Sequence, residues 1–146
     1  MKHIFNTIIM AVLVIWPGVQ PTAGQTRRMA VTAQSENMMR ALPDYESALE
    51  TQSLMGTIVE ITGEKGYWRE IASPQPYKAW TTEKGLVEMS QQQIEEYKAA
   101  PKVLFAALYD HLYSKPSASS ATICDLVGGD LLRFVRKKGV DYSTPL

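Results

Sequence analysis

The chain contains one internal repeat, aligned without a gap. Residues 37–66 match residues 110–139 at a constant offset. The identical pairs are Pro43 with Pro116, Ser47 with Ser120, Ala48 with Ala121, Gly56 with Gly129, Lys65 with Lys138, and Gly66 with Gly139. Apolar character is kept at Met39 and Leu112, Ile58 and Leu131, Val59 and Leu132, and Ile61 and Phe134. A repeat of this kind indicates one structural unit used twice.

The two copies differ in extent. The first continues beyond the matched region through Trp68, Tyr77 and Trp80, whereas the sequence printed here reaches Leu146 soon after the second copy's matched region. We therefore expect that the second unit cannot close its own core. We also expect residues after about Ala100 to be less ordered than residues 30–89.

The charge balance of the chain bears on two classes of partner. The chain has 15 basic and 15 acidic side chains and a formal net charge of zero. This balance gives no electrostatic reason to expect binding to nucleic acid or to an anionic membrane surface. The hydrophobic content of 45% is that of an ordinary globular chain.

Residues 1–24 have the layout of a secretory signal peptide. Lys2 and His3 precede an apolar run over residues 8–16, and small residues at 22–24 offer a cleavage site. The run is shorter than the roughly 20 residues that a membrane span needs. The sequence therefore predicts export to the periplasm or the extracellular space, with no membrane association after cleavage.

The next segment is predicted to be all-β. Residues 57–62 are rich in β-branched side chains, residues 63–66 form a glycine-containing hairpin loop, and residues 67–71 alternate as a partner strand should. Further short strands separated by Pro and Gly turns bring the number to about six over residues 30–89. Short strands at this density favour a small β-barrel.

A helical linker is predicted at residues 90–101. Ser90 and Gln93 have capping-box spacing, Ile94 and Tyr97 follow at helical spacing, and Pro101 ends the run. The strand pattern then returns over residues 102–146, which we assign to the partial second unit.

No cluster of side chains points to catalysis. Cys124 is the single cysteine, and outside the predicted signal peptide His111 is the only histidine. A nucleophilic cysteine needs an adjacent base, so we expect Cys124 to be a small buried apolar side chain. We expect no metal and no cofactor, because no Cys/His cluster and no glycine-rich phosphate loop is present.

These residues resemble a bacterial SH3 (SH3b) domain. The matching segments of the first copy are Asn37-Met-Met-Arg40 with Pro43, then Leu54-x-Gly56-x-x-Val59, then Gly66-x-Trp68, and Tyr77-x-Ala-Trp80. The resemblance implies an SH3-like barrel at residues 30–89 and an incomplete second SH3-like module at residues 102–146.

The arrangement of a complete module, a helical connector and a second module resembles the N-terminal half of secreted NlpC-type cell-wall cysteine peptidases. In that family a catalytic domain follows the SH3b modules, and we expect it to be absent from this chain. The catalytic role does not carry over to Cys124, which lies inside the second repeat. In the resembled peptidases the first module borders the catalytic cleft and helps to recognise the free amine end of a cell-wall peptide. The resemblance implies that Tyr77 lies in that region, with Asp44 or Glu46 as an acidic partner.

Four aromatic residues are the predicted ligand-binding side chains: Tyr45, Trp68, Tyr77 and Trp80. Aromatic faces suit sugars and peptides because they combine apolar area with a polar group. The alternative for Trp68 and Trp80 is a place in the core, since a small barrel needs large side chains there.

The sequence thus favours a non-catalytic, exported protein that recognises the stem peptide or glycan of peptidoglycan. Two alternatives stay open. The chain is the targeting half of a peptidoglycan endopeptidase whose catalytic half is missing or encoded separately as a partner domain, or it is an extracytoplasmic protein-interaction module of SH3 type.

Overall fold

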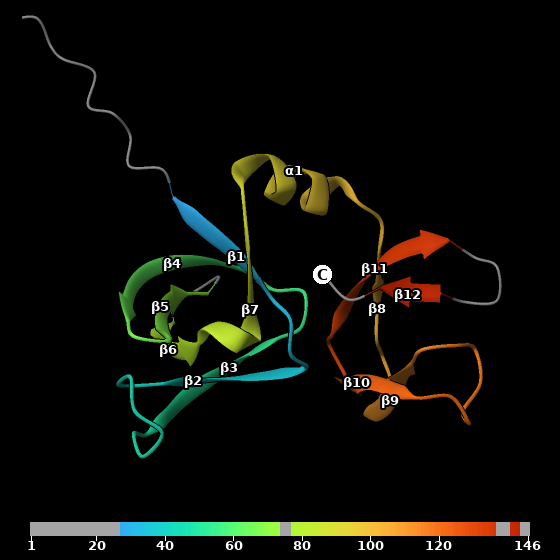
Figure 1. Ribbon diagram of the computed structural model, residues 1–146, viewed down its shortest axis with the longest axis horizontal. Helices are drawn as coiled ribbons and strands as arrows, with labels where there is room; N and C mark the ends of the chain where they lie inside the picture. Colours follow the sequence, from blue (N-terminus) through green and yellow to red (C-terminus); the bar gives the residue numbers. More distant parts are fainter. Residues whose placement is uncertain (1–26, 74–76, 137–140, 144–146) are drawn as a thin grey trace, which may run out of the picture.

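The computed structural model describes residues 27–73, 77–136 and 141–143. Two β-rich halves lie side by side, and one helix runs across the top of both (Figure 1). The predicted signal peptide lies outside the described residues. None of the helices in the described ranges has the length and apolar character that a membrane span requires.

The first half is one antiparallel sheet. Its strands are β1 (Arg28–Thr32), β2 (Glu36–Arg40), β3 (Leu49–Leu54), β4 (Ile58–Lys65), β5 (Trp68–Ala72), β6 (Lys78–Thr82) and β7 (Leu86–Met89), with a 3₁₀ turn, η1 (Glu83–Gly85), before β7. Their order is β3-β2-β6-β5-β4-β1-β7. The prediction of a mainly β chain with one helix is confirmed. The predicted barrel closure is not seen, because β3 and β7 are the two ends of this sheet among the described residues.

The core of the first half follows from the two-residue period of its strands, which places alternate side chains on one face. Val59 and Ile61 of β4 face Ile71 of β5 and Ala79 of β6, and all four are buried. Ala30 and Met39 complete the cluster. A hairpin joins β4 and β5 as predicted, but its turn is Gly66 and Tyr67 rather than residues 63–66, because residues 63–65 pair with β5 as part of β4.

Helix α1 (Gln91–Ala99) begins where the sequence predicts. The Ser90 hydroxyl accepts from the Gln93 backbone N–H, and the Gln93 side chain accepts from the Ser90 N–H, which is the predicted capping box. Ile94 and Tyr97 are buried against Val31 of β1. At the other end the Lys102 ammonium donates to the carbonyl of Tyr97 at 2.6 Å and so satisfies part of the helix C-terminus.

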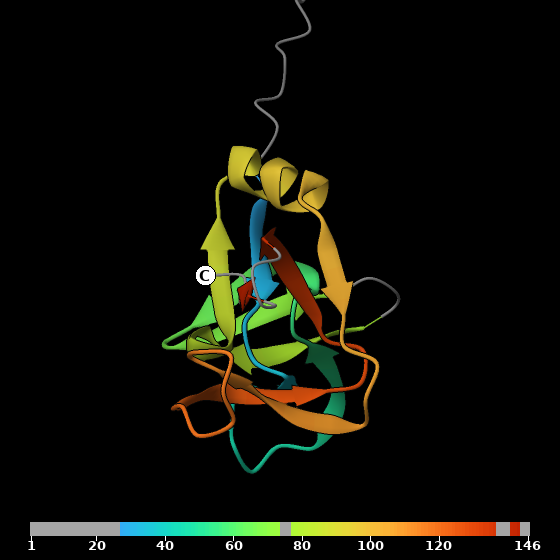
Figure 2. The same ribbon diagram turned by 90° about the vertical axis from the view of Figure 1, so that its right-hand side faces the viewer.

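The second half contains two small sheets. Strands β9 (Tyr109–Tyr113) and β10 (Thr122–Val127) pair with each other, and β8 (Lys102–Leu104), β11 (Leu131–Arg136) and β12 (Asp141–Ser143) form a sheet in the order β12-β11-β8. Figure 2 turns this half toward the viewer.

The repeat predicted from the sequence is present in the backbone. β9 and β10 cover the residues that match β2 and β3, and β11 and β12 begin where the counterparts of β4 and β5 begin. Gly56 and Gly129 are matched residues, and both have positive φ, 85° and 107°. Each N–H donates to a matched carbonyl, that of Thr32 at 2.8 Å for Gly56 and that of Phe105 at 2.9 Å for Gly129. The two halves are therefore copies of one backbone plan.

The core of the second half is completed by a residue of the first. Met55 has no exposed surface and packs with Leu112, Leu126 and Leu132. The Leu131 N–H donates to the Met55 carbonyl at 3.0 Å. These contacts tie the two halves together.

A buried carboxylate reinforces this junction. Asp130 is fully buried and accepts from the backbone N–H groups of Met55 at 3.1 Å and Val127 at 2.9 Å, and from the hydroxyl of Ser35. A buried carboxylate needs such donors, since burial without them is costly. Because two of the three donors belong to the first half, the junction depends on both halves being folded.

Candidate functional site

A tight loop presents the first candidate, Tyr45. The Arg40 guanidinium donates to the Ser47 carbonyl at 2.7 Å, and the Ser47 hydroxyl accepts from the Leu42 N–H at 2.9 Å. The Asp44 carboxylate accepts from the Glu46 N–H at 3.0 Å. Tyr45 is thereby held at the loop tip with 58% of its surface exposed.

Three aromatic rings meet at this loop, and we call them the aromatic cluster: Tyr45, Tyr67 and Trp68. The Tyr45 and Trp68 ring centroids are 4.9 Å apart, and Tyr67 stacks on both neighbours at 6.2 and 5.6 Å. Trp68 is 6% exposed, whereas Tyr67 is 48% exposed. The buried indole is therefore the base on which two exposed phenol rings are held.

Grooves lie on both sides of Tyr45. One of about 190 Å³ is also lined by Trp68, Arg40, Glu36 and Thr81, among others. The other, of about 270 Å³, is lined by Tyr45, Tyr67, Thr82, Glu83 and Lys84. Because Tyr45 and Thr82 line both, the two grooves adjoin along the aromatic cluster.

The first groove, of about 190 Å³, has a polar wall whose side chains are held by buried hydrogen bonds. The Thr81 hydroxyl donates to the Asn37 side-chain oxygen at 2.8 Å, and the Asn37 amide donates to the Ser53 hydroxyl at 3.3 Å. All three side chains are buried. A Cβ on Gly85 would lie 2.2 Å from that Asn37 oxygen, so only glycine fits here. The wall is thus built with little freedom to move.

The rim carries charges of both signs. Glu36 and Arg40 border the first groove, and Glu83 and Lys84 border the second. Desolvation of the Tyr45 hydroxyl, followed by the neighbouring Tyr67 hydroxyl, raises the pKa of Tyr45. Tyr45 therefore stays a neutral hydrogen-bond donor at ordinary pH. Stacked phenol rings and a mixed rim suit a polar, uncharged or zwitterionic ligand.

The structure separates the four residues predicted from the sequence into two groups. Tyr45 and Trp68 come together, whereas Tyr77 and Trp80 line neither groove. Trp80 is half-buried on the face of β6 opposite to buried Ala79, and Tyr77 is 50% exposed just before that strand. The roles of Tyr77 and Trp80 stay predictions.

Sequence reasoning did not single out the polar wall. Asn37 and Thr81 lie on strands far apart in the chain, and only the β2–β6 pairing brings them together. Asp44, a predicted acidic partner for an amine, accepts from the Glu46 N–H in the Tyr45 loop, and its predicted role stays a prediction. Glu46 is exposed beside it.

Cys124 and His111 do not form a catalytic pair. Cys124 lies opposite Leu112 in the β9–β10 pairing and packs against the second core, whereas His111 lies opposite Asp125. Adjacent strand positions point to opposite faces. The His111 Nδ1 is 2.9 Å from an Asp125 carboxylate oxygen. Burial, then the charges of Asp130 and Asp125, raises the pKa of Cys124, which keeps it a thiol.

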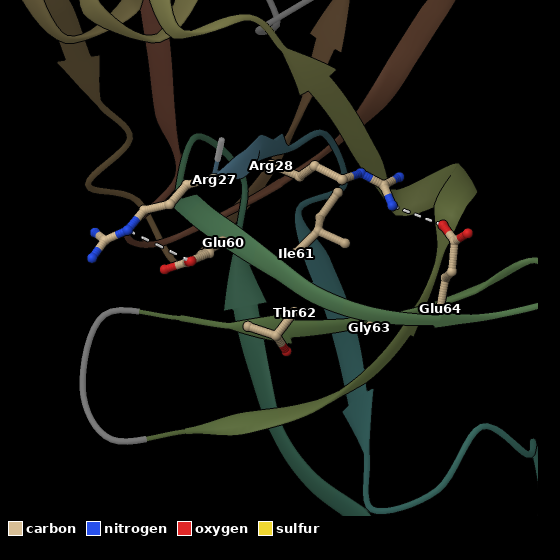
Figure 3. Close-up of a pocket in the computed structure, with 7 residues that line it drawn as sticks. All are labelled: Arg27, Arg28, Glu60, Ile61, Thr62, Gly63 and Glu64. Carbon is tan, nitrogen blue, oxygen red and sulfur yellow. Dashed lines mark hydrogen bonds and ion pairs between the residues drawn. The ribbon is translucent and has the colours of Figure 1, made fainter. Parts of the chain in front are cut away.

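A larger hollow of about 520 Å³ lies elsewhere on the first half, along β4. Figure 3 shows Arg27 directed at Glu60 and Arg28 directed at Glu64. The Arg28 guanidinium is 2.8 Å from Glu64 and 3.1 Å from Glu88. The charges here are paired with one another, so the hollow offers little to a ligand. In the described ranges no group of three or more His, Cys, Asp or Glu side chains is placed to hold a metal ion.

Comparison with known proteins identifies a shared fold. No protein-family model matches the sequence, and no curated protein matches it either. Among solved structures, the chain is similar to an NlpC/P60 family protein from Bacillus cereus ATCC 10987, with a TM-score of 0.62 and 20% sequence identity. The match covers 78% of this chain and 50% of that protein. The chain therefore has the fold of about half of that protein.

Proposed function

We propose that this chain is a non-catalytic, exported recognition module for the cell wall. In this proposal the two halves are tandem SH3-like modules, the second incomplete. The ligand is the stem peptide or the glycan of peptidoglycan, bound along the aromatic cluster. The observation that carries the proposal is the fixed stack of Tyr45 and Tyr67 over Trp68, with grooves on both sides of Tyr45.

The chemistry of the cluster supports this ligand class. The exposed faces of Tyr45 and Tyr67 offer apolar area for a sugar ring or an alanine methyl group, and their hydroxyls offer hydrogen bonds. The Arg40 and Lys84 side chains at the rim suit peptide carboxylates, and Glu36 and Glu83 suit an amine. A stem peptide carries both kinds of group.

The fold supports the same conclusion. The chain matches about half of an NlpC/P60 family protein, and in this proposal that half is the substrate-recognition part. The predicted signal peptide would bring it to the cell wall, and a separately supplied peptidase domain would be a natural partner. No nucleic acid and no membrane partner is proposed.

A second candidate function rests on the same comparison. Because the chain spans about half the length of the solved structure that it matches, it is also suited to be the targeting half of a peptidoglycan endopeptidase. In that case the aromatic cluster would bind substrate only beside the catalytic domain. A third candidate, an extracytoplasmic protein-interaction module, would use the same groove for an extended peptide.

The test is a pull-down of residues 25–146, which contain every described residue, on insoluble peptidoglycan. Tyr45→Ala removes an exposed ring, and Tyr109→Ala is the matched control because it removes a tyrosine of similar exposure outside the cluster. We expect Tyr45→Ala to weaken binding about tenfold, the effect of losing one aromatic contact of roughly 1.4 kcal/mol. Tyr109→Ala should bind like the parent chain.

Three results would count against the proposal. Equal binding by the parent and Tyr45→Ala would remove the aromatic cluster from the account. No binding by a chain with an intact fold would favour the targeting half of a peptidase. Binding to unrelated extended peptides would favour the interaction module.

A further inference from the structure

The second groove, of about 270 Å³, is bordered by one acidic and one basic side chain, Glu83 and Lys84. The two differ in their partners. The Arg69 guanidinium donates to the Glu83 carboxylate at 2.7 Å. Glu88 also approaches Arg69, at 3.5 Å, but has a closer partner in Arg28 at 3.1 Å. Lys84 has no ion pair among the residues that the structure describes, so its ammonium is the uncompensated charge at this groove.

The pairing of Glu83 is fixed by the turn that carries the aromatic cluster. The Arg69 side chain is 14% exposed, and its guanidinium also donates to the carbonyls of Gly66 at 2.8 Å and Trp68 at 3.1 Å. The Glu83 N–H donates to the Tyr67 carbonyl at 2.9 Å. Glu83 is therefore held to the β4–β5 turn through both its side chain and its backbone, and its carboxylate is engaged before a ligand arrives.

The remaining side chains of the second groove carry hydroxyl groups that can donate hydrogen bonds. They are Tyr45, Tyr67 and Thr82. In the described ranges the Thr82 hydroxyl has no hydrogen-bond partner. A carboxylate accepts at both of its oxygens, so hydroxyls beside an ammonium match it, whereas an amine would meet a charge of its own sign. In the first groove the basic residue is Arg40, whose guanidinium is already bonded to the Ser47 carbonyl.

We propose that the second groove binds a carboxylate of the peptide ligand and that Lys84 selects for that carboxylate. This inference rests on the proposed function, and it makes a peptide with a free carboxylate the ligand rather than the glycan. The Lys84 ammonium and the Thr82 hydroxyl donate to the carboxylate oxygens. Arg69 is a positioning residue, because it acts through Glu83 and keeps that side chain from competing for Lys84.

The probe is a synthetic stem peptide, prepared as the free acid and in forms amidated at the C-terminus, at the side-chain carboxylates, or at both. Each form is titrated into ¹⁵N-labelled residues 25–146, and the Kd is taken from the shift of the Trp68 indole signal. Full amidation should weaken binding about fivefold, the effect of losing one exposed ion pair. The singly amidated forms show whether the carboxylate in the groove comes from the C-terminus or from a side chain.

Three variants assign the effect to Lys84. Lys84→Gln should weaken binding of the free acid about fivefold and leave the Kd of the fully amidated form unchanged, because the two changes remove the same contact. Lys115→Gln is the matched control, since it removes the charge of an exposed lysine in the second half. Glu83→Gln leaves the Arg69 charge without this partner, so it should tighten binding of the free acid about twofold. A variant that binds more tightly is folded.

Equal affinity for the free acid and the fully amidated peptide would overturn this inference and leave the proposed function standing. An equal loss for both forms in Lys84→Gln, or weaker binding of the free acid by Glu83→Gln, would also overturn it. A parent chain that binds insoluble peptidoglycan but none of the peptide forms would show that the ligand is the glycan. Binding to neither would overturn the inference and the proposed function together.

Discussion

Replacing Met55 with alanine tests whether the second half depends on the first. Met55 belongs to the first repeat by sequence, yet it is fully buried in the core of Leu112, Leu126 and Leu132. Its counterpart in the second repeat is Gly128, which has no side chain to contribute. The methionine is therefore a large, fully buried side chain that the first copy adds to the second core.

The expected cost follows from burial. Truncating a fully buried Met, Leu or Ile to Ala costs about 2–5 kcal/mol, because transfer energy and a cavity add. Since every ~1.4 kcal/mol is a factor of ten, a loss of about 3 kcal/mol raises the open fraction of the second half roughly a hundredfold. The cost should fall on the second half alone.

Native-state hydrogen exchange measures this directly. In Met55→Ala, amides of β9, β10 and β11 should exchange about a hundredfold faster, while those of β5 change little. Met38→Ala is the control, since Met38 is 48% exposed and should cost under ~0.5 kcal/mol. Equal loss of protection in both halves, or a cost below about 1 kcal/mol, would refute the reasoning.

Three further outcomes are expected. Hydrogen bonding to Lys78 lowers the pKa of Glu70 in the folded state. The Glu70 carboxylate therefore stabilises the fold above its unfolded pKa, and this stabilisation is lost as the pH falls through its folded pKa. Glu70→Gln should flatten the acid limb of a curve of unfolding free energy against pH, and an unchanged limb would contradict this. Gly66 has φ 60° and open space around it, so Gly66→Ala should lower the free energy of unfolding in urea by about 1–2 kcal/mol. Gly56→Ala should lower it by more, because its Cβ would lie 2.4 Å from the Leu131 carbonyl oxygen of the second half. Equal losses for the two variants would contradict this close approach. Burial raises the pKa of Cys124, so the alkylation rate of Cys124 should rise at a higher pH than the alkylation rate of a cysteine in a free peptide. If the two pH profiles were the same, the Cys124 thiol would be exposed.

Much of the fold was predictable because its signals are local. The capping box at Ser90 needs only residues three apart, and the hairpin between β4 and β5 needs only a glycine turn between alternating strands, although that turn is at Gly66 and Tyr67 rather than over residues 63–66. The repeat was also visible in sequence, and it holds down to matched glycines with positive φ. The repeat did not predict that Met55 of the first half packs in the core of the second half. No local sequence pattern indicates which hydrophobic cluster a side chain joins.

The site was predictable only in part. Tyr45 was placed in an exposed loop by the Pro-Asp turn before it, and the structure puts it there. The contact between Tyr45 and Trp68 depends on how the loop folds over a distant hairpin, and the buried Asn37–Thr81 wall depends on strand pairing. Such long-range contacts leave no signal in a single sequence.

The most direct test of the central claim is a titration of ¹⁵N-labelled residues 25–146 with a soluble peptidoglycan fragment. This segment contains two tryptophans, and their indole N–H signals report separately on the aromatic cluster and on β6. The account predicts that the Trp68 signal moves with added fragment while the Trp80 signal stays in place. Movement of Trp80 alone, or of neither indole in the presence of binding, would contradict it.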